Sequence, residues 1–128
     1  MSTPADIVKT FLAMWETPGG IEKSLRDYFT PETRYENVGL SVTTGVDQAM
    51  AVFAGFSASL GMATMWVENL HVAAAGDTVL TERIDHVRDS SGKTLMSIRV
   101  MGAFDVKEGK IMAWRDYFDT AGFASGAS

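Results

Sequence analysis

The second half of the chain is a run of strand-like segments joined by tight turns. Alternating apolar residues, many of them β-branched or aromatic, characterise four segments at 64–72, 78–88, 94–106 and 110–118. The connections are short and carry turn residues, namely Gly76-Asp77, Ser90-Ser91-Gly92 and Glu108-Gly109. Because strands joined so closely pair with their chain neighbours, an antiparallel meander is expected.

The first half predicts three helices. A capping threonine, a proline and an acid at 3–6 begin the first helix, and Pro18-Gly19-Gly20 ends it. The segments that follow are a short helix stopping before Pro31, a strand at 33–38, a loop at 39–45 and a third helix at 46–60. Helices followed by a meander indicate an α+β fold, with the helices packed on one face of a bent sheet.

Composition excludes several classes of function. The 128 residues are enough for one domain, 1–128, and 46% of them are hydrophobic. The net charge of −5 and the lack of a Lys/Arg cluster argue against nucleic acid or a membrane surface as partner. With no cysteine, thiolate catalysis and disulfides are excluded. No signal peptide or membrane-spanning run is seen, so a cytoplasmic location is expected.

The last strand carries a carboxylate among apolar side chains. Because strand side chains alternate, Met112, Trp114, Asp116 and Phe118 are predicted to share one face. A carboxylate there is either paired or held partly dry. On the preceding strand Gly102 has no side chain, which indicates a bend or a space kept open. Asp116 is therefore a candidate functional residue, with a structural role as the alternative.

Arg83 and Asp85 lie two residues apart on one face of the strand at 78–88. Neither face of that strand is clearly apolar, so the sequence leaves open which one points inward. Such a pair is usually a surface ion pair worth about 0–1 kcal/mol. If their face is inward, both side chains enter a common cavity. Tyr35 and Asn37 share a face of the strand at 33–38 and by themselves are ordinary strand and turn residues.

Five segments carry a pattern that extends over most of the chain. They are Tyr35-Glu36-Asn37, Thr81-Glu82-Arg83-Ile84-Asp85, Gly102-x-Phe104, Glu108-Gly109-Lys110-Ile111 and Trp114-Arg115-Asp116-Tyr117-Phe118-Asp119. Together they resemble the limonene-1,2-epoxide hydrolase family of the nuclear-transport-factor-like superfamily. The Arg-x-Asp element combined with the distant Trp-Arg-Asp-Tyr-Phe element is the most specific part. The helices and the loop at 39–44 depart from the family pattern, and they shape the pocket mouth.

This resemblance implies a cone-shaped fold, with three helices on the concave face of a strongly bent, mixed but mainly antiparallel sheet. It also implies a cofactor-free, one-step hydrolysis of an apolar, cyclic or terpene-like epoxide to a vicinal diol. Asp116 would be the general base, with Tyr35 and Asn37 holding the water, and Asp85 would be the general acid. Arg83 would fix both carboxylates. The two carboxylates and the guanidinium together would carry a net charge of −1, so one shared proton would make the site neutral.

The resemblance further implies a homodimer through the outer sheet face and an apolar pocket. Residues expected to line that pocket are Trp15, Met62, Met65, Val87, Ile98, Val100 and Phe118. Aromatic and aliphatic side chains more often belong only to the hydrophobic core than to a pocket, and this alternative is strongest for Trp15. No metal site is expected, because the only histidines, His71 and His86, stand at unrelated positions.

Two other functions remain open at this point. One is a ketosteroid-isomerase-like or polyketide-cyclase-like enzyme on the same scaffold, using an aspartate in an apolar cone as base. That chemistry does not need the Arg-x-Asp partner, so Arg83 and Asp85 favour hydrolysis. The other is a non-catalytic module for ligand binding or dimerisation, since a fold never proves a function.

Overall fold

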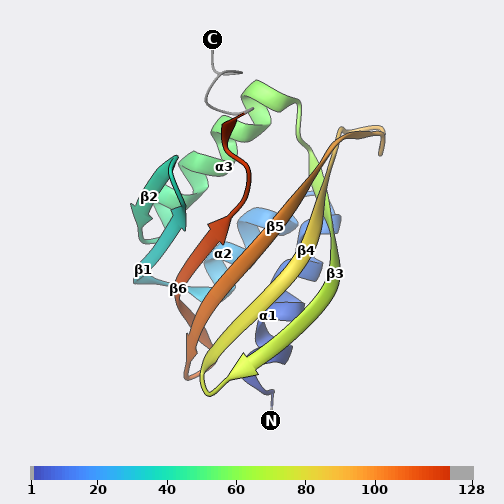
Figure 1. Ribbon diagram of the computed structural model, residues 1–128. Helices are drawn as coiled ribbons and strands as arrows, with labels where there is room; N and C mark the ends of the chain where they lie inside the picture. The colour runs from blue at the N-terminus through green and yellow to red at the C-terminus, as the bar shows by residue number, and fades with distance from the viewer. Residues whose placement is uncertain (1, 122–128) are drawn as a thin grey trace.

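Helices precede most of the strands along the chain. The computed structural model describes residues 2–121 (Figure 1). Its helical elements are α1 (Pro4–Ala13), the 3-10 helix η1 (Met14–Glu16), α2 (Gly20–Tyr28) and α3 (Val46–Leu60). Its strands are β1 (Phe29–Asn37), β2 (Ser41–Thr44), β3 (Thr64–Ala75), β4 (Thr78–Arg88), β5 (Thr94–Lys107) and β6 (Lys110–Tyr117).

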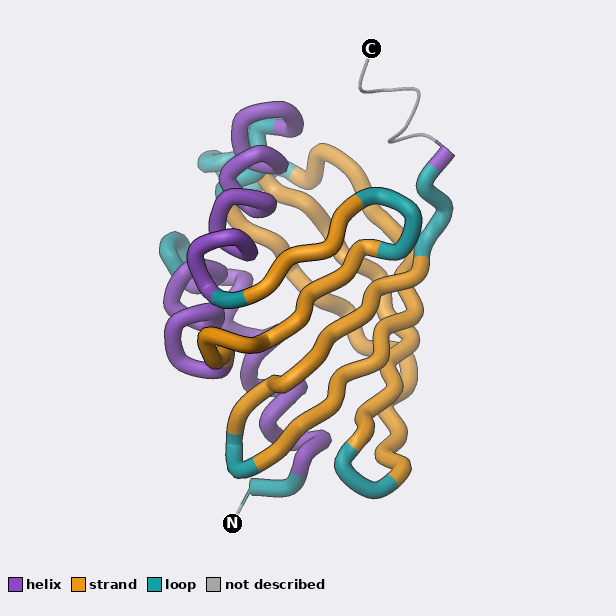
Figure 2. The backbone as a smooth tube through the Cα atoms, turned by 90° about the vertical axis from the view of Figure 1, so that its left-hand side faces the viewer, coloured by secondary structure: helices purple, strands orange, loops and turns teal. Residues whose placement is uncertain are grey.

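The six strands form one mixed sheet in the order β2-β1-β6-β5-β4-β3. Every neighbouring pair is antiparallel except β1 and β6, which are parallel. The helices cover one face of the sheet, and in Figure 2 the strands curve around that helical side. The predicted α+β fold, with three helices on the concave face of a bent and mainly antiparallel sheet, is confirmed.

Two boundaries of the first half differ from the sequence prediction. The second helix ends at Tyr28, and Phe29 begins a strand that is longer than predicted. Residues 39–45, predicted to be a loop, contain β2, which pairs antiparallel with β1. That prediction was wrong because a four-residue edge strand is too short to show an alternating pattern.

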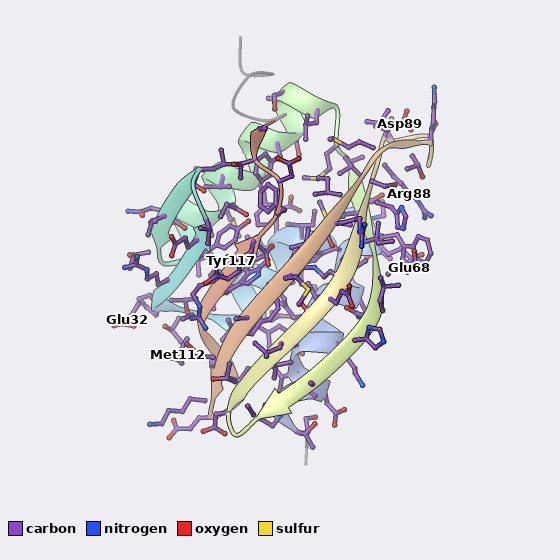
Figure 3. The ribbon with its side chains drawn as sticks, viewed as in Figure 1. Glu32, Glu68, Arg88, Asp89, Met112 and Tyr117 are labelled. Atoms are coloured by element: carbon purple, nitrogen blue, oxygen red, sulfur yellow. The ribbon has the colours of Figure 1, made fainter. Side chains whose placement is uncertain are left out.

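A β-bulge changes the inward face of β6. Asp105 pairs with Ala113 whereas Val106 pairs with Ile111, so Met112 is an extra residue in the ladder. Ile111 is fully buried, while Met112 is 37% exposed (Figure 3). The predicted common face of Met112 and Trp114 was therefore wrong, although Trp114 and Asp116 do face inward. Strict alternation fails wherever a ladder takes in an additional residue.

Aromatic rings form the core between the helices and the sheet. Trp114 lies at its centre, stacked on Tyr35 at 4.1 Å and on Phe104 at 5.4 Å between ring centroids. Trp15 packs on Trp114 at 5.4 Å and donates its Nε1–H to the buried Ser24 hydroxyl at 3.0 Å. These buried rings and their partners hold the helices against the middle of the sheet.

Candidate active site

An apolar cavity with one polar end lies beside this aromatic core. Its polar lining side chains are Asn37, Asp85 and Asp116 together with the hydroxyl of Tyr35. The apolar lining residues are Trp15, Phe53, Phe56, Leu60, Met62, Met65, Val87, Ile98, Val100, Trp114 and Phe118. Asn37, Asp85 and Asp116 are each only 4–5% exposed, so ionisable groups are held here in a nearly dry site.

Strand register brings the polar residues together. Thr81 of β4 pairs with Gly102 of β5, Gly102 with Asp116 of β6, and Asp116 with Asn37 of β1. These four residues form a single row across the sheet. Arg83 and Asp85 follow on the same face of β4, where every second residue from Val79 to Val87 is buried. The face that the sequence left undecided is therefore the inward one.

Arg83 joins the two carboxylates. Its Nε donates to Asp85 Oδ1 at 2.9 Å and its Nη2 to Asp85 Oδ2 at 3.3 Å. The same Nη2 donates to Asp116 Oδ2 at 2.6 Å, and Nη1 donates to Thr81 Oγ1 at 3.0 Å. Arg83 is 1% exposed and lies behind the cavity wall rather than among its lining residues. The guanidinium thus binds both carboxylates from behind the cavity wall, and the two carboxylates themselves line the cavity.

Gly102 leaves the space in which this cluster meets. A Cβ atom at this position would lie 2.4 Å from Arg83 Nη1, 2.7 Å from Asp116 Oδ1 and 2.9 Å from Thr81 Oγ1. Such distances are shorter than non-bonded atoms tolerate, so any side chain here would push the cluster apart. As expected, the missing side chain at mid-strand leaves a space, and Arg83, Asp116 and Thr81 occupy it.

Burial and the neighbouring charges shift the pKa values of Asp85 and Arg83. Burial raises the pKa of Asp85 above its ordinary value, and the Arg83 cation opposes that rise. For Arg83, burial alone would lower the pKa, but Asp116 and Asp85 outweigh it and raise the pKa. The guanidinium therefore stays charged, and Asp85 is the member of the cluster that burial predisposes to hold a proton.

Tyr35 and Asn37 complete the polar end. Asn37 Nδ2 donates to the Tyr35 hydroxyl at 2.9 Å and to Ser41 Oγ at 3.3 Å. Burial raises the pKa of Tyr35, so its hydroxyl keeps its proton. With Tyr35 accepting from Asn37, its own O–H is left to donate, and Asn37 Oδ1 is left to accept. A small polar molecule in the cavity could bond to both.

The residues predicted to form the site all lie at this cavity, except Arg83, which lies directly behind it. The seven predicted apolar lining residues and Tyr35, Asn37, Asp85 and Asp116 all line it. Trp15 is at once core and cavity wall, being 1% exposed.

Sequence reasoning missed several contributors. Trp114 donates its Nε1–H to Asp116 Oδ1 at 2.7 Å, yet it was treated only as a motif residue. Phe53, Phe56 and Leu60 of α3 also line the cavity, and their helical spacing could have identified one face. Ser41, on the unpredicted strand β2, had no sequence signal.

Among residues 2–121, no three or more His, Asp and Glu side chains are grouped so that they could hold a metal ion. None of the helices in the described part of the chain is long and apolar enough to span a membrane.

Comparisons with known proteins place this geometry in context. A family model described as the limonene-1,2-epoxide hydrolase catalytic domain matches residues 2–127. The epoxide hydrolase EphG of Mycobacterium tuberculosis (strain ATCC 25618 / H37Rv) is 35% identical over 85 residues, which are 66% of this chain. That alignment spans 54% of the relative's length, so the match takes in about half of that protein.

Solved structures share the architecture. A limonene-epoxide-hydrolase-like epoxide hydrolase of M. tuberculosis superposes with a TM-score of 0.74 at 27% identity, covering 96% of this chain and 83% of that one. A SnoaL-like polyketide cyclase fold from Jannaschia sp. CCS1 has a TM-score of 0.76 at 18% identity, covering 96% and 90%. At that identity the second likeness concerns the fold alone.

Proposed function

Because this chain belongs to the limonene-1,2-epoxide hydrolase family, we propose that it is an epoxide hydrolase, formed by residues 1–128 as one domain. The observation that carries the proposal is the buried bridge from Asp85 through Arg83 to Asp116 at the polar end of an apolar cavity. Two carboxylates around one guanidinium can act as an acid and a base in the same site.

Asp116 is the general base in this proposal. It accepts hydrogen bonds from Arg83 Nη2 and Trp114 Nε1, which suits an ionised carboxylate. Tyr35 and Asn37 offer a water molecule one donor and one acceptor beside Asp116. The water oxygen forms a bond to one epoxide carbon while Asp116 takes a water proton.

Asp85 is the general acid. Its raised pKa favours the protonated form, which is the form that can donate to the epoxide oxygen. As the carbon–oxygen bond of the ring breaks, the proton of Asp85 passes to the leaving oxygen. The product is a vicinal diol, Asp116 then holds the proton gained from water, and proton exchange with solvent returns the pair to its starting state. No covalent intermediate is needed.

The lining of the cavity supports an apolar substrate. Beyond its polar end the wall consists of aromatic, aliphatic and methionine side chains. We expect Val87, Ile98, Val100 and Phe118 to contact the carbon skeleton of the epoxide, together with Trp15, Met62 and Met65. Methionine side chains adapt readily to irregular ligands, so cyclic and terpene-like epoxides are the first substrates to test.

The outer face of the sheet supports a homodimer. Leu70, Leu80, Met101 and Tyr117 are 41–51% exposed. Leu70, Met101 and Tyr117 line one shallow depression, and Leu80 lies on the face of β4 opposite its buried residues (Figure 3 labels Tyr117). Glu82 and Arg99 lie among them and offer charges of both signs to a second copy. Sedimentation of the wild type and of Met101→Asp tests this. We expect the wild type to be a dimer and Met101→Asp, with its introduced charge, to be a monomer. A monomeric wild type would contradict the proposal.

The activity is tested by incubating the enzyme with cyclic and terpene-like epoxides in ¹⁸O-labelled water under single-turnover conditions. Direct attack of water predicts a labelled diol in the first turnover. Label retained by the enzyme would indicate a covalent route instead. If the protein converts no epoxide but shifts the double bond of an enone, an isomerase replaces this proposal. If it converts neither, a binding module replaces it.

A further inference from the structure

Thr81 holds the one edge of the Arg83 guanidinium that faces no carboxylate. It lies two residues before Arg83 on β4 and is 1% exposed. Its Oγ1 accepts from Arg83 Nη1 at 3.0 Å, and its own hydroxyl donates to the Gly102 carbonyl at 3.4 Å. A neutral side chain buried against a cation, with its hydroxyl tied to the neighbouring strand, has a fixed position.

The three sides of the guanidinium are therefore divided among three residues. Nε and Nη2 serve Asp85, Nη2 also serves Asp116, and Nη1 serves Thr81. Above Gly102, Nη1 and Asp116 Oδ1 border the same small space, because a Cβ built there would lie within 2.7 Å of both. If Thr81 did not accept from Nη1, the nearby acceptor for that N–H would be Asp116.

We propose that Thr81 is a positioning residue for hydrolysis: by accepting from Nη1, it keeps the guanidinium turned so that two of its nitrogens, Nε and Nη2, bond Asp85 while Nη2 alone bonds Asp116. The inference rests on the proposed function, since it assigns the two carboxylates different tasks. Shared in this way, Arg83 holds the acid through two nitrogens and the base through one, so Asp116 Oδ1 accepts no hydrogen bond from the guanidinium.

Loss of this acceptor has a definite consequence. An unpaired N–H in a dry site seeks another partner, so the guanidinium turns toward Asp116 Oδ1 and away from Asp85. The groups acting on Asp85 are Arg83 and His86 on its own strand, Asp116 on β6 and Tyr35 on β1. Only Arg83 moves in this account. With less of the cation to oppose burial, the pKa of Asp85 rises further.

The experiment compares Thr81→Val with Thr81→Ser and with a matched control, Thr33→Val. Thr33 is also fully buried, and its hydroxyl donates to the Ile111 carbonyl at 2.6 Å, but it does not line the cavity. Thr81→Ala is a second way to remove the acceptor if the valine does not fit. Two readouts are used: steady-state epoxide hydrolysis against pH, and ¹³C NMR titration of the Asp85 carboxyl, which needs no turnover.

Thr81→Val is expected to lower kcat about tenfold with KM within about twofold, as for a misplaced catalytic group. Its alkaline activity limb and its Asp85 titration midpoint both move to higher pH. Thr81→Ser restores both values, and Thr33→Val leaves both in place. A titration midpoint unchanged in Thr81→Val and Thr81→Ala overturns the inference. A wild type that hydrolyses no epoxide overturns the proposed function instead, while the NMR titration still decides the role of Thr81.

Discussion

Arg83 Nη2 lies 2.6 Å from Asp116 Oδ2, although the two residues belong to strands that are separated by β5. The contact passes over Gly102, which contributes no side chain to the space between them. On its other edge the same guanidinium lies 2.9 Å from Asp85 Oδ1. One planar cation thus spans the middle of the sheet, and its shape as well as its charge sets the positions of both acids.

Replacing Arg83 by lysine keeps the charge and removes that shape. A lysine ammonium cannot reach Asp85, Asp116 and Thr81 together with the same geometry, so buried hydrogen bonds remain unmade. We expect kcat/KM for epoxide hydrolysis to fall about 100-fold or more, and the free energy of unfolding to fall by about 1–3 kcal/mol. Arg99→Lys, exposed on the outer face, is the control for both measurements. An active Arg83→Lys enzyme would show that charge alone suffices.

Asp116→Asn tests the base. An asparagine fills the same space and its oxygen still accepts from Trp114 or Arg83, but it cannot take a proton from water. Diol formation is expected to fall by about 10²–10⁴, with an unchanged circular dichroism spectrum and retained binding of an apolar epoxide analogue. Asp105→Asn, which removes the half-exposed partner of Arg115, controls for loss of a carboxylate on the sheet. Substantial turnover by Asp116→Asn would assign the base elsewhere.

Asp85 predicts an alkaline limb in the pH dependence of activity. Burial raises its pKa, and only the protonated acid can donate to the epoxide oxygen, so kcat/KM falls as the pH rises through that raised value. Asp85→Asn removes the donor and should abolish both most of the activity and this limb. An unaltered limb in Asp85→Asn would contradict the assignment of the acid.

The raised pKa of Asp85 also makes the stability of the folded state depend on pH. A folded state with the higher pKa binds the proton more tightly than the unfolded chain does. The contribution of Asp85 to the free energy of unfolding is therefore fully present below the unfolded pKa of the residue and is lost as the pH rises through the folded pKa. Denaturant unfolding across that pH range, for the wild type and Asp85→Asn, measures it.

Asp116 could be identified from the sequence because apolar neighbours on its strand made it anomalous, and Trp114 does face inward with it. Arg83 and Asp85 could not be identified in this way. Both faces of their strand carry polar as well as apolar residues, and the face that became buried includes Thr81, Arg83 and Asp85. The resemblance to a family supplied what periodicity lacked, because ion pairing compensates for the burial of charge only after the sheet has formed.

Features that depend on pairing between strands were the ones that the sequence did not reveal. The bulge at Met112 and the edge strand β2 both follow from the partners of a strand rather than from its own residues. The bond from Trp114 Nε1 to Asp116 likewise depends on the rotation of a ring that any inward tryptophan could adopt differently. Fold class was predictable because turn residues and alternation are local.

Gly102 offers the sharpest test of how the fold makes room for the site. Its replacement by alanine places a methyl group within 3 Å of Arg83 Nη1, Asp116 Oδ1 and Thr81 Oγ1. Overpacking of this kind costs about 1–3 kcal/mol of unfolding free energy. Because the displaced atoms belong to the carboxylate bridge, activity should fall by much more than stability.

The matched control is Gly55→Ala in α3, where, apart from the neighbouring backbone of the helix itself, no heavy atom lies within 4 Å of the added Cβ. Alanine is a better helix former than glycine, so this variant should be more stable by about 0.5–1 kcal/mol and keep its activity. Comparing diol formation and denaturant unfolding in the two variants separates the effect of a methyl group from the effect of its place. If Gly102→Ala hydrolyses epoxides as fast as Gly55→Ala does, the close approach at Gly102 is not needed for catalysis, and the bridge tolerates a wider separation than its 2.6 Å contact implies.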